Sequence, residues 1–265
     1  MNFPVIEMFA SIQGEGMYTG VPSFFVRVSG CNLRCCFKDS ICDTPYSSYN
    51  PKKTPYKSMD DLVESFNKLR KENPKINHLV ITGGEPMLYK EGLKEFLSKV
   101  YEEDMIITVE TNGTIEPIPA YTEDYTIELW SISPKLSTSV GDANGKLSVE
   151  AINHHNKTRI NIPALYKYVM DGLLYQFKFV YSGEECIKEI EDLYEQLNEY
   201  NKTQNPDNDC WFESDLHSNT MLMPEGTTNE QLTKSRIEVV EKCVEKGWRY
   251  TDRTHIIIFG DVRGV

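Results

Sequence analysis

Short apolar runs recur along the chain, and most of them end in glycine, serine or a charged residue. Apolar runs of about four to eight residues with such ends are typical of strands buried in a sheet. We expect strands at residues 4–9, 23–28, 78–82, 105–109, 127–132, 176–181, 220–223 and 255–259. What lies between these runs decides the fold class.

Amphipathic segments separate several of the runs. Apolar residues at helical spacing predict helices at residues 58–70, 90–101, 184–200 and 229–246, and Ser58 and Asp61 form a capping box at the start of the first. Strand, polar loop and helix alternate in this way about six times, which predicts parallel strands covered by helices. Because the repeats fall short of eight, we expect an α/β fold built as a partial, open barrel of about six parallel strands.

We expect a single domain over residues 1–265 with two insertions. Residues 136–173 contain no clear core strand and carry two amphipathic segments, at 149–156 and 163–170. Residues 201–209 are predicted to be a polar loop. The first insertion contains His154 and His155, which are compatible with a metal site, although an exposed pair on a loop is the simpler interpretation.

Net charge, apolar run length and cysteine count argue against nucleic-acid-binding, membrane-spanning and secreted proteins. A formal net charge of −12 argues against a protein that grips a nucleic-acid backbone, so we expect no nucleic-acid partner. No run of about 18 apolar residues is present, so we expect no membrane span. The N-terminal residues do not resemble a secretory signal, and the seven cysteines are an odd number, so we expect a cytoplasmic protein with reduced thiols.

Residues 31–46 contain four of the seven cysteines. Protein cores distribute free cysteines through the fold, whereas crowded thiols are typical of metal and iron–sulfur sites. Cys31, Cys35 and Cys42 lie on one loop, so three thiolates can surround one object. Three ligands would leave one iron of a four-iron cluster open to a small molecule. A structural zinc site is the alternative for this stretch.

Glycine and polar residues follow the predicted strands, at the end where α/β barrels carry their sites. Gly83 and Gly84 leave backbone open to a ligand, and Glu85 offers a carboxylate to an ammonium group. Ser133 and Lys135 add a hydroxyl and a cation at another strand end. These groups would suit a ligand that carries both an amino acid and an adenosine part.

Arg27 lies inside an apolar run. A buried guanidinium is unfavourable unless it meets an anion, so Arg27 either faces solvent on an edge strand or binds an anionic ligand. The glycine-rich residues 13–16 are equally open between a plain turn and a backbone that approaches a ligand.

The motifs resemble those of the radical S-adenosylmethionine superfamily and, within it, the 7-carboxy-7-deazaguanine synthase family. The resemblance rests on E-M-F-A-S-I-Q-G-E-G-M-Y-T-G-V-P at 7–22, F-V-R-V-S-G-C-N-L-R-C at 25–35, C-D-T-P-Y at 42–46, T-G-G-E-P at 82–86, E-T-N-G at 110–113, S-P-K at 133–135, and His255 with R-G-V at 263–265. It spans nearly the whole chain and is thin over the two predicted insertions.

This resemblance implies a radical enzyme that binds a four-iron, four-sulfur cluster, S-adenosylmethionine and Mg²⁺. The family converts 6-carboxy-5,6,7,8-tetrahydropterin to 7-carboxy-7-deazaguanine and ammonia through a 5′-deoxyadenosyl radical. The resemblance further implies a homodimer and an external electron donor of the flavodoxin or ferredoxin kind. It leaves open whether the product feeds tRNA modification, DNA modification or a free deazapurine.

By position in these motifs, the resemblance assigns site residues to four roles. The cluster would be bound by Cys31, Cys35 and Cys42, and Mg²⁺ by Thr44. S-adenosylmethionine would be bound by Ile41, Asp43, Gly83, Gly84, Glu85, Thr111, Asn112, Ser133, Pro134, Lys135, Met223, Pro224 and Glu225. The pterin would be bound by Ile12, Gln13, Gly14, Arg27, Thr82, His255 and the C-terminal carboxylate of Val265. The expected catalytic residues are Arg27, Gln13 and Glu15, with Arg27 meeting the substrate carboxylate.

One spacing departs from the superfamily pattern. The usual C-x3-C-x2-C is C-x3-C-x6-C here, so Cys36 competes with Cys35 as the second ligand. We expect Cys35, because it keeps the first gap ordinary. Two other functions stay open at this point: another radical enzyme, such as a glycyl-radical activase, and a zinc- or cluster-binding interaction protein without turnover.

Overall fold

The computed structural model describes residues 2–37, 41–141, 147–205, 211–260 and 262–264. Within these ranges one sheet contains eight strands, and their order in space is their order in the chain. They are β1 (Val5–Ile12), β2 (Pro22–Val28), β3 (His78–Gly83), β4 (Ile106–Thr111), β5 (Leu129–Ile132), β6 (Leu174–Tyr181), β7 (Thr220–Pro224) and β8 (Arg249–Tyr250). β1 runs antiparallel to β2, and all the other neighbouring pairs are parallel.

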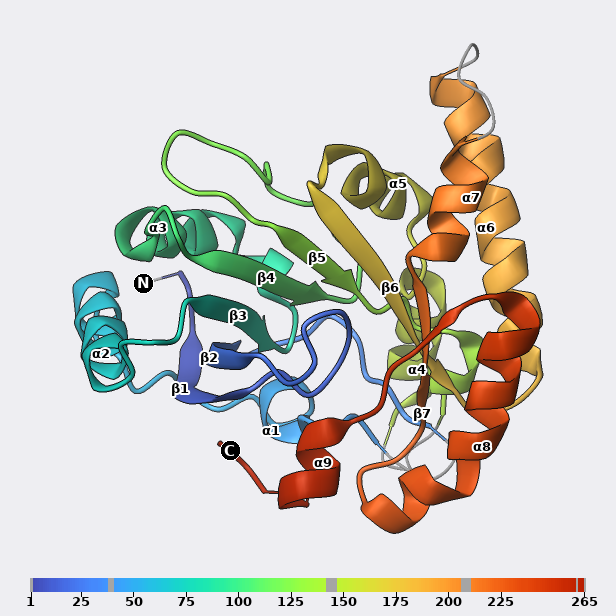
Figure 1. Ribbon diagram of the computed structural model, residues 1–265, viewed down its shortest axis with the longest axis horizontal. Coiled ribbons are helices and arrows are strands. Elements are labelled where there is room, and N and C mark those ends of the chain that lie inside the picture. Colours follow the sequence, from blue (N-terminus) through green and yellow to red (C-terminus); the bar gives the residue numbers. More distant parts are fainter. Residues whose placement is uncertain (1, 38–40, 142–146, 206–210, 261, 265) are drawn as a thin grey trace.

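Helices connect all the neighbouring parallel strands except β4 and β5, and they cover the sheet (Figure 1). They are α1 (Pro45–Ser48), α2 (Met59–Glu72), α3 (Lys90–Val100), α4 (Val149–Thr158), α5 (Ile162–Asp171), α6 (Glu185–Gln204), α7 (Trp211–Ser218), α8 (Asn229–Lys246) and α9 (Thr254–Phe259), with 3₁₀ turns at Pro86–Tyr89 and Ser137–Ser139. In the parts of the chain that the structure describes, none of these helices is both long and apolar enough to cross a membrane.

The predicted α/β architecture is confirmed. The sheet is open in the described ranges, because β1 and β8 are its two end strands. The six expected parallel strands correspond to β2 through β7. The short strand β8 is a further parallel strand that the sequence pattern did not predict.

The prediction of a strand at residues 255–259 is wrong, because this run forms helix α9. The free edge of β7 is paired with β8, where Met221 lies opposite Arg249. Because β8 already pairs with that edge of β7, residues 254–259 form a helix instead. Ile256 is buried in this helix, while Ile257 and Ile258 are exposed. Periodicity alone does not distinguish helix from strand in so short an apolar run.

The segments predicted as insertions contain regular structure. The two amphipathic segments expected within 136–173 are α4 and α5. Helix α6 continues to Gln204, so the first part of the expected loop at 201–209 is helical, and residues 206–209 lie outside the described ranges. Helix α7 was not predicted.

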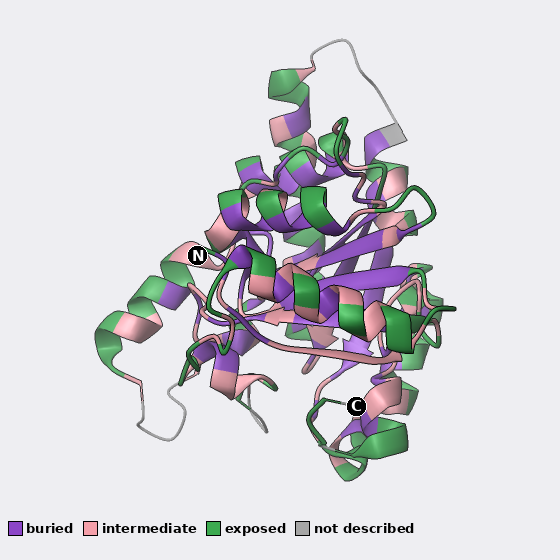
Figure 2. Ribbon diagram, turned by 90° about the vertical axis from the view of Figure 1, so that its left-hand side faces the viewer, coloured by how far each residue is buried: buried purple, intermediate pink, exposed green. Residues whose placement is uncertain are grey.

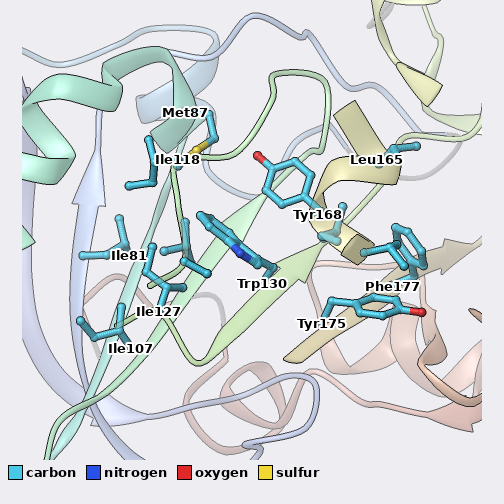
Figure 3. Packing of buried hydrophobic residues seen from close by; sticks show 14 of the residues in the cluster. Ile81, Met87, Ile107, Ile118, Ile127, Trp130, Leu165, Tyr168, Tyr175 and Phe177 are labelled. Atoms are coloured by element: carbon cyan, nitrogen blue, oxygen red, sulfur yellow. The ribbon is translucent and has the colours of Figure 1, made fainter. Parts of the chain in front are cut away.

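The hydrophobic core lies between the sheet and the helices that cover it. Figure 2 shows buried strands at the centre and helices whose outer faces are exposed. In Figure 3, Trp130 of β5 meets Tyr168 of α5 edge to face, with ring centroids 5.0 Å apart. The Tyr168 hydroxyl donates to the Ile115 carbonyl at 2.8 Å, which satisfies its one polar group. Burying large apolar side chains in this way stabilises the fold by about 1.5–3 kcal/mol each.

Polar side chains from successive strands share the other face of the sheet. Arg27 of β2 lies opposite Thr82 of β3, and Glu110 of β4 lies opposite Ser131 of β5. Side chains opposite each other in neighbouring strands point to the same face, so these four share one side. Lys178 of β6 lines the same cavity. The concave face is therefore polar toward the carboxyl ends of the strands.

A loop, rather than strand pairing, spans the open side of the sheet. The Gly16 N–H donates to Thr251 Oγ1 at 2.7 Å, and the Thr254 N–H donates to the Gly14 carbonyl at 2.9 Å. These bonds link the segment after β1 to the chain after β8. Gly16 has a φ of 76°, and a Cβ there would meet the Gln176 side chain at 2.2 Å, so this turn requires glycine.

His78 is a buried histidine at the start of β3. Its Nδ1 lies 2.7 Å from Ser23 Oγ, and its Nε2 lies 2.9 Å from Thr108 Oγ1. Burial lowers the pKa of His78 from its ordinary value of 6.5 to about 4. Between these two values the unfolded chain binds a proton that the folded chain does not, so stability falls as the pH drops through that window.

We predict that lowering the pH from 7 to 5 removes about 2 kcal/mol of folding free energy through His78 alone. The test is urea unfolding of the metal-free protein at both pH values, for the natural chain and for His78→Asn, which does not titrate. The loss between pH 7 and pH 5 should be smaller by about that amount in the variant. An identical pH dependence in the two proteins would contradict the prediction.

Candidate active site

A cavity of about 300 Å³ lies on the concave side of the sheet, with the ends of β2 to β7, the cysteine loop and α9 around it. This volume is at the lower end of the range for small-molecule sites. Most of the residues that the sequence singled out line it, and these are Ile12, Gln13, Gly14, Glu15, Arg27, Cys31, Cys35, Ile41, Cys42, Asp43, Thr44, Thr82, Gly83, Gly84, Thr111, Asn112, Ser133, Lys135, Met223, Glu225 and His255.

Three cysteines of the loop face this cavity. Cys31, Cys35 and Cys42 line it, whereas Cys36 does not. The Cys42 N–H donates to the Cys35 carbonyl at 3.0 Å, which joins the second and third cysteines directly. The Cys36 thiol lies 3.8 Å from the Phe37 carbonyl oxygen. This arrangement supports Cys35 over Cys36 as the second ligand.

Burial raises the pKa of two of the cavity-facing thiols, Cys31 and Cys35, so these two are protonated in the metal-free protein. Burial, helped by the Glu85 carboxylate, raises the pKa of Cys31 to about 11, and burial also raises the pKa of Cys35. Such thiols lose their protons only when a metal charge replaces them. The Leu33 N–H lies 3.4 Å from the Cys31 sulfur, where it would stabilise a thiolate.

The donor set fits an iron–sulfur cluster better than a single metal ion. Across the described ranges, no three His, Cys, Asp or Glu side chains converge on one ion. A structural zinc ion needs four ligands at about 2.0–2.3 Å. The thiolates of a four-iron cluster each bind a different iron, so they are spread farther apart. Three cysteines around one cavity suit a four-iron cluster, and such a cluster would have one iron without a protein ligand.

Glu110 and Lys178 form a charged floor that the sequence analysis did not assign. The Lys178 ammonium lies 2.9 Å from Glu15 and 3.4 Å from Glu110. Glu110 also accepts hydrogen bonds from Gln13 Nε2 at 3.3 Å and from Thr82 Oγ1 at 2.6 Å. Glu110 and Lys178, which were not predicted as site residues, therefore join three residues that were: Gln13, Glu15 and Thr82. The sequence could have indicated Lys178 as a site residue, because it is a charged residue within the apolar strand β6, just as Arg27 is within β2.

Neighbouring charges keep Glu15 and Lys178 ionised. Burial alone would raise the pKa of Glu15, but the Lys178 ammonium and the Arg253 guanidinium outweigh burial and hold that pKa well below its usual range. Burial would lower the pKa of Lys178, but the carboxylates of Glu110 and Glu15 hold it well above its usual range. Glu15, expected to be catalytic, is thus suited to binding and orienting a ligand rather than to donating a proton.

Arg253 is a second buried cation that the sequence analysis missed. Its guanidinium donates to the Gly226 carbonyl at 2.6 Å, pairs with Asp43 at 2.5 Å and lies 3.3 Å from Glu15. Asp43 directly follows Cys42, so Arg253 fixes the position of the third cysteine from the far end of the chain. Asp43 was expected to contact S-adenosylmethionine, and it lines the cavity while paired in this way.

Arg27 faces the cavity but already has an anionic partner. Its Nε donates to Glu7 at 2.7 Å. Glu7 also accepts from the Tyr46 hydroxyl at 3.1 Å and from Arg263 Nε at 2.6 Å. The protein thus supplies an anion for this cation itself. A guanidinium carries five N–H donors, so the bond to Glu7 leaves capacity for a second anion.

Glu85 does not line the cavity, which corrects the prediction that it contacts S-adenosylmethionine. It is fully buried, and its carboxylate accepts from the Met87 N–H at 3.0 Å, the Asn112 N–H at 2.7 Å and the Thr111 hydroxyl at 2.8 Å. Glu85 therefore joins the ends of β3 and β4. Thr111 and Asn112, which it holds, do line the cavity.

Two predicted prolines are also absent from the cavity wall. Pro134 lies between the lining residues Ser133 and Lys135, and Pro224 follows the lining residue Met223. Both prolines are buried, because in extended backbone alternate residues face opposite sides. The remaining prediction, Val265, lies outside the described residues.

Gly84 allows the end of β3 to touch the start of the cysteine loop. A Cβ at this position would lie 1.8 Å from the Gly30 carbonyl oxygen. The Gly84 N–H donates to the Val28 carbonyl at 3.0 Å, and the Glu85 N–H donates to the Gly30 carbonyl at 2.8 Å. Any side chain at Gly84 would push the cysteine loop away from the strand.

We predict that Cys35→Ala loses the cluster after anaerobic reconstitution, whereas Cys36→Ala retains it. Cys36 is the matched control because it is adjacent in sequence and similarly buried but does not face the cavity. Iron and sulfide content per chain, together with the brown absorption of the cluster, measures the difference. Loss in Cys36→Ala with retention in Cys35→Ala would reverse the assignment.

Comparison with known proteins agrees with this site. A family model described as the radical SAM superfamily matches residues 25–135. The 7-carboxy-7-deazaguanine synthase of Halobacterium salinarum is 36% identical over 260 residues, which cover 97% of this chain and 91% of that protein. The protein of the same name from Rhodopirellula baltica is 32% identical over 260 residues, covering 98% of this chain and 88% of that protein.

A solved structure shares the fold. The crystal structure of QueE from Escherichia coli matches with a TM-score of 0.54 at 22% identity, covering 96% of this chain and 94% of that chain. Identity over nearly the full length of the first two relatives is the stronger finding. This chain belongs to the 7-carboxy-7-deazaguanine synthase family of radical S-adenosylmethionine enzymes.

Proposed function

We propose that this chain is a carbon–nitrogen lyase that converts 6-carboxy-5,6,7,8-tetrahydropterin to 7-carboxy-7-deazaguanine and ammonia. One observation carries the proposal: a single cavity has three cysteines on one wall and a network of buried charges on another. The first feature suits a radical cofactor, and the second suits a small polar substrate that must be held in one orientation.

The cofactors would be held by the loop and the strand ends. Cys31, Cys35 and Cys42 would bind a four-iron, four-sulfur cluster, and S-adenosylmethionine would lie against the strand ends that carry Gly84 and Ser133. When bound, these two groups supply the one-electron chemistry that yields a 5′-deoxyadenosyl radical. Binding of these two groups to this chain is supported by the three cysteines and by Gly84 and Ser133, all of which line the same cavity.

We assign Mg²⁺ to Thr44. Its hydroxyl lines the cavity and lies 3.5 Å from the Cys42 sulfur, so an ion there would sit beside the cluster. Magnesium binds through oxygen and commonly keeps several waters and ligand oxygens, so one protein hydroxyl is a reasonable share of its coordination.

The pterin would be oriented by ionic groups at both of its ends. The guanidinium of Arg27 suits the substrate carboxylate, since planar bidentate pairing favours this combination. The Glu110 carboxyl group suits the N–H groups of the aminopyrimidinone ring, with Gln13 and Thr82 bonded to the same group. Arg27 and Glu110 both line this cavity, so one small substrate can contact the two groups at once.

The remaining functional assignments also belong to the proposal. The family resemblance supports a homodimer and an external electron donor of the flavodoxin or ferredoxin kind. The sequence pattern supports a single domain with two insertions, and the odd number of cysteines supports a cytoplasmic location. The net charge of −12 supports the absence of a nucleic-acid partner.

The direct test is product formation. Anaerobically reconstituted protein is incubated with S-adenosylmethionine, a reductant, Mg²⁺ and carboxytetrahydropterin, and the mixture is examined by mass spectrometry. We expect 7-carboxy-7-deazaguanine, and omission of Mg²⁺ should slow its formation. Cleavage of S-adenosylmethionine by fully clustered protein without this product would favour another radical enzyme, such as a glycyl-radical activase.

We predict that Arg27→Gln lowers kcat/KM for the pterin by roughly a hundredfold, because a charge-assisted hydrogen bond to the carboxylate is lost. Cluster content should stay unchanged, since Arg27 binds no cysteine. Initial rates over a range of pterin concentrations, with iron analysis of the same samples, provide the measurement. A variant with unaltered kcat/KM would remove Arg27 from the proposed site.

A further inference from the structure

His155 is a buried histidine in a segment to which the proposed function gives no role. It lies on α4, and its side chain is 2% exposed, whereas its neighbour His154 is exposed. The interpretation of the two histidines as an exposed pair on a loop is therefore wrong for His155. Both of its ring nitrogens have hydrogen-bond partners, and one partner belongs to the cysteine loop.

The direction of these hydrogen bonds follows from the partners. The Arg34 N–H lies 3.0 Å from His155 Nδ1, and a backbone N–H can only donate, so Nδ1 accepts. The proton of the neutral ring is then on Nε2, which donates to Ser139 Oγ at 3.0 Å. Ser139 Oγ in turn donates to the Leu136 carbonyl at 2.6 Å. Burial, with the nearby charges of Arg159 and Lys135, lowers the pKa of His155 to about 4, which keeps the ring in this neutral form.

A second link runs beside the first. The Cys36 N–H donates to the Ser139 carbonyl at 2.9 Å. A Cβ at Gly141 would lie 2.9 Å from the Cys36 carbonyl oxygen, so the two backbones are packed against each other. Residues 34–36 of the cysteine loop are thus bonded to the segment that follows β5, and His155 provides the side-chain part of that attachment.

The attachment acts at the centre of the cluster-binding turn. Arg34 lies between Cys31 and Cys35, and its guanidinium donates to the carbonyls of Cys31 and Leu33, both at 2.8 Å. These bonds fold residues 31–34 into one compact turn. The part-buried Arg34 N–H itself donates to His155. Without His155 this N–H would lose that partner, which favours local opening of the turn.

We propose that His155 is a positioning residue for the cysteine loop. By accepting the Arg34 N–H it fixes the backbone between Cys31 and Cys35, and with it the direction in which their sulfur atoms face the cavity. His155 does not line the cavity in which the cluster and the substrate would bind. This inference rests on the proposed ligand role of Cys31 and Cys35 and deepens it, because it gives the segment 136–158 a part in supporting the site.

Hydrogen–deuterium exchange of the metal-free full-length chain tests the positioning directly. Peptides over residues 32–37 are compared in the natural protein, His155→Leu, His155→Asn and the control His154→Asn. We expect about tenfold faster exchange of the loop peptides in His155→Leu, with β3 and β4 unchanged. Asparagine places its Oδ1 near the position of Nδ1, so His155→Asn should restore nearly natural exchange. The control should match the natural protein.

A second readout follows iron in the reconstituted protein. Loss of iron to a chelator, followed by the decay of cluster absorption, should be several times faster in His155→Leu than in His155→Asn or the control. Should His155→Leu fail to fold, Ser139→Ala replaces it, since it removes the partner of Nε2 and should speed loop exchange in the same peptides.

Three results would overturn the proposal. They are equal loop exchange in His155→Leu and the natural protein, acceleration spread evenly over all peptides, and an asparagine variant that exchanges as fast as the leucine one. Absence of product from the natural enzyme would instead refute the proposed function. It would leave the exchange comparison intact, because that comparison is made without metal or substrate.

Discussion

Successive side chains of a β-strand point to opposite faces, and this alternation organises the whole molecule. The apolar side chains of one set, such as Trp130, pack against the covering helices. The other set places Arg27, Thr82, Glu110 and Lys178 around one cavity. A shift of one residue in any strand would exchange the two sets, so the register that builds the core also builds the site.

Burying several charges on one face of the sheet is unfavourable unless each charge is paired, and this requirement determines the arrangement of the site. A buried ion is stable only with close partners, and here each has one: Lys178 lies between Glu15 and Glu110, and Arg253 between Asp43 and Glu15. Lys178 and Arg253 hold the pKa of Glu15 low against the effect of burial, and Arg253 does the same for the pKa of Asp43, so these charges are in place before any ligand arrives. Such preorganisation favours orientation of a small polar substrate over proton exchange with it.

The sequence carried the local features of this structure and missed the long-range ones. Strands β2 to β7, helix α8 and the cavity-facing trio of cysteines were predictable, since each rests on a periodicity or a motif within a short stretch. The pairing of Asp43 with Arg253 joins residues 210 apart, and no local pattern encodes it. The sequence pattern predicted a strand where α9 forms, because only the assembled sheet shows that β8 already pairs with the edge of β7. Glu85 and His155 were misplaced for a related reason, as burial depends on what packs above a residue.

The central claim is that Cys31, Cys35 and Cys42 hold a cluster beside a pterin that the charged floor orients. A crystal structure of the anaerobically reconstituted protein with S-adenosylmethionine and carboxytetrahydropterin tests it most directly. The account predicts a cluster on these three sulfurs, the substrate carboxylate on Arg27 and the pterin ring edge on Glu110. Iron bound through Cys36 in place of Cys35, a zinc ion with four protein ligands, or a pterin lying outside this cavity would contradict it.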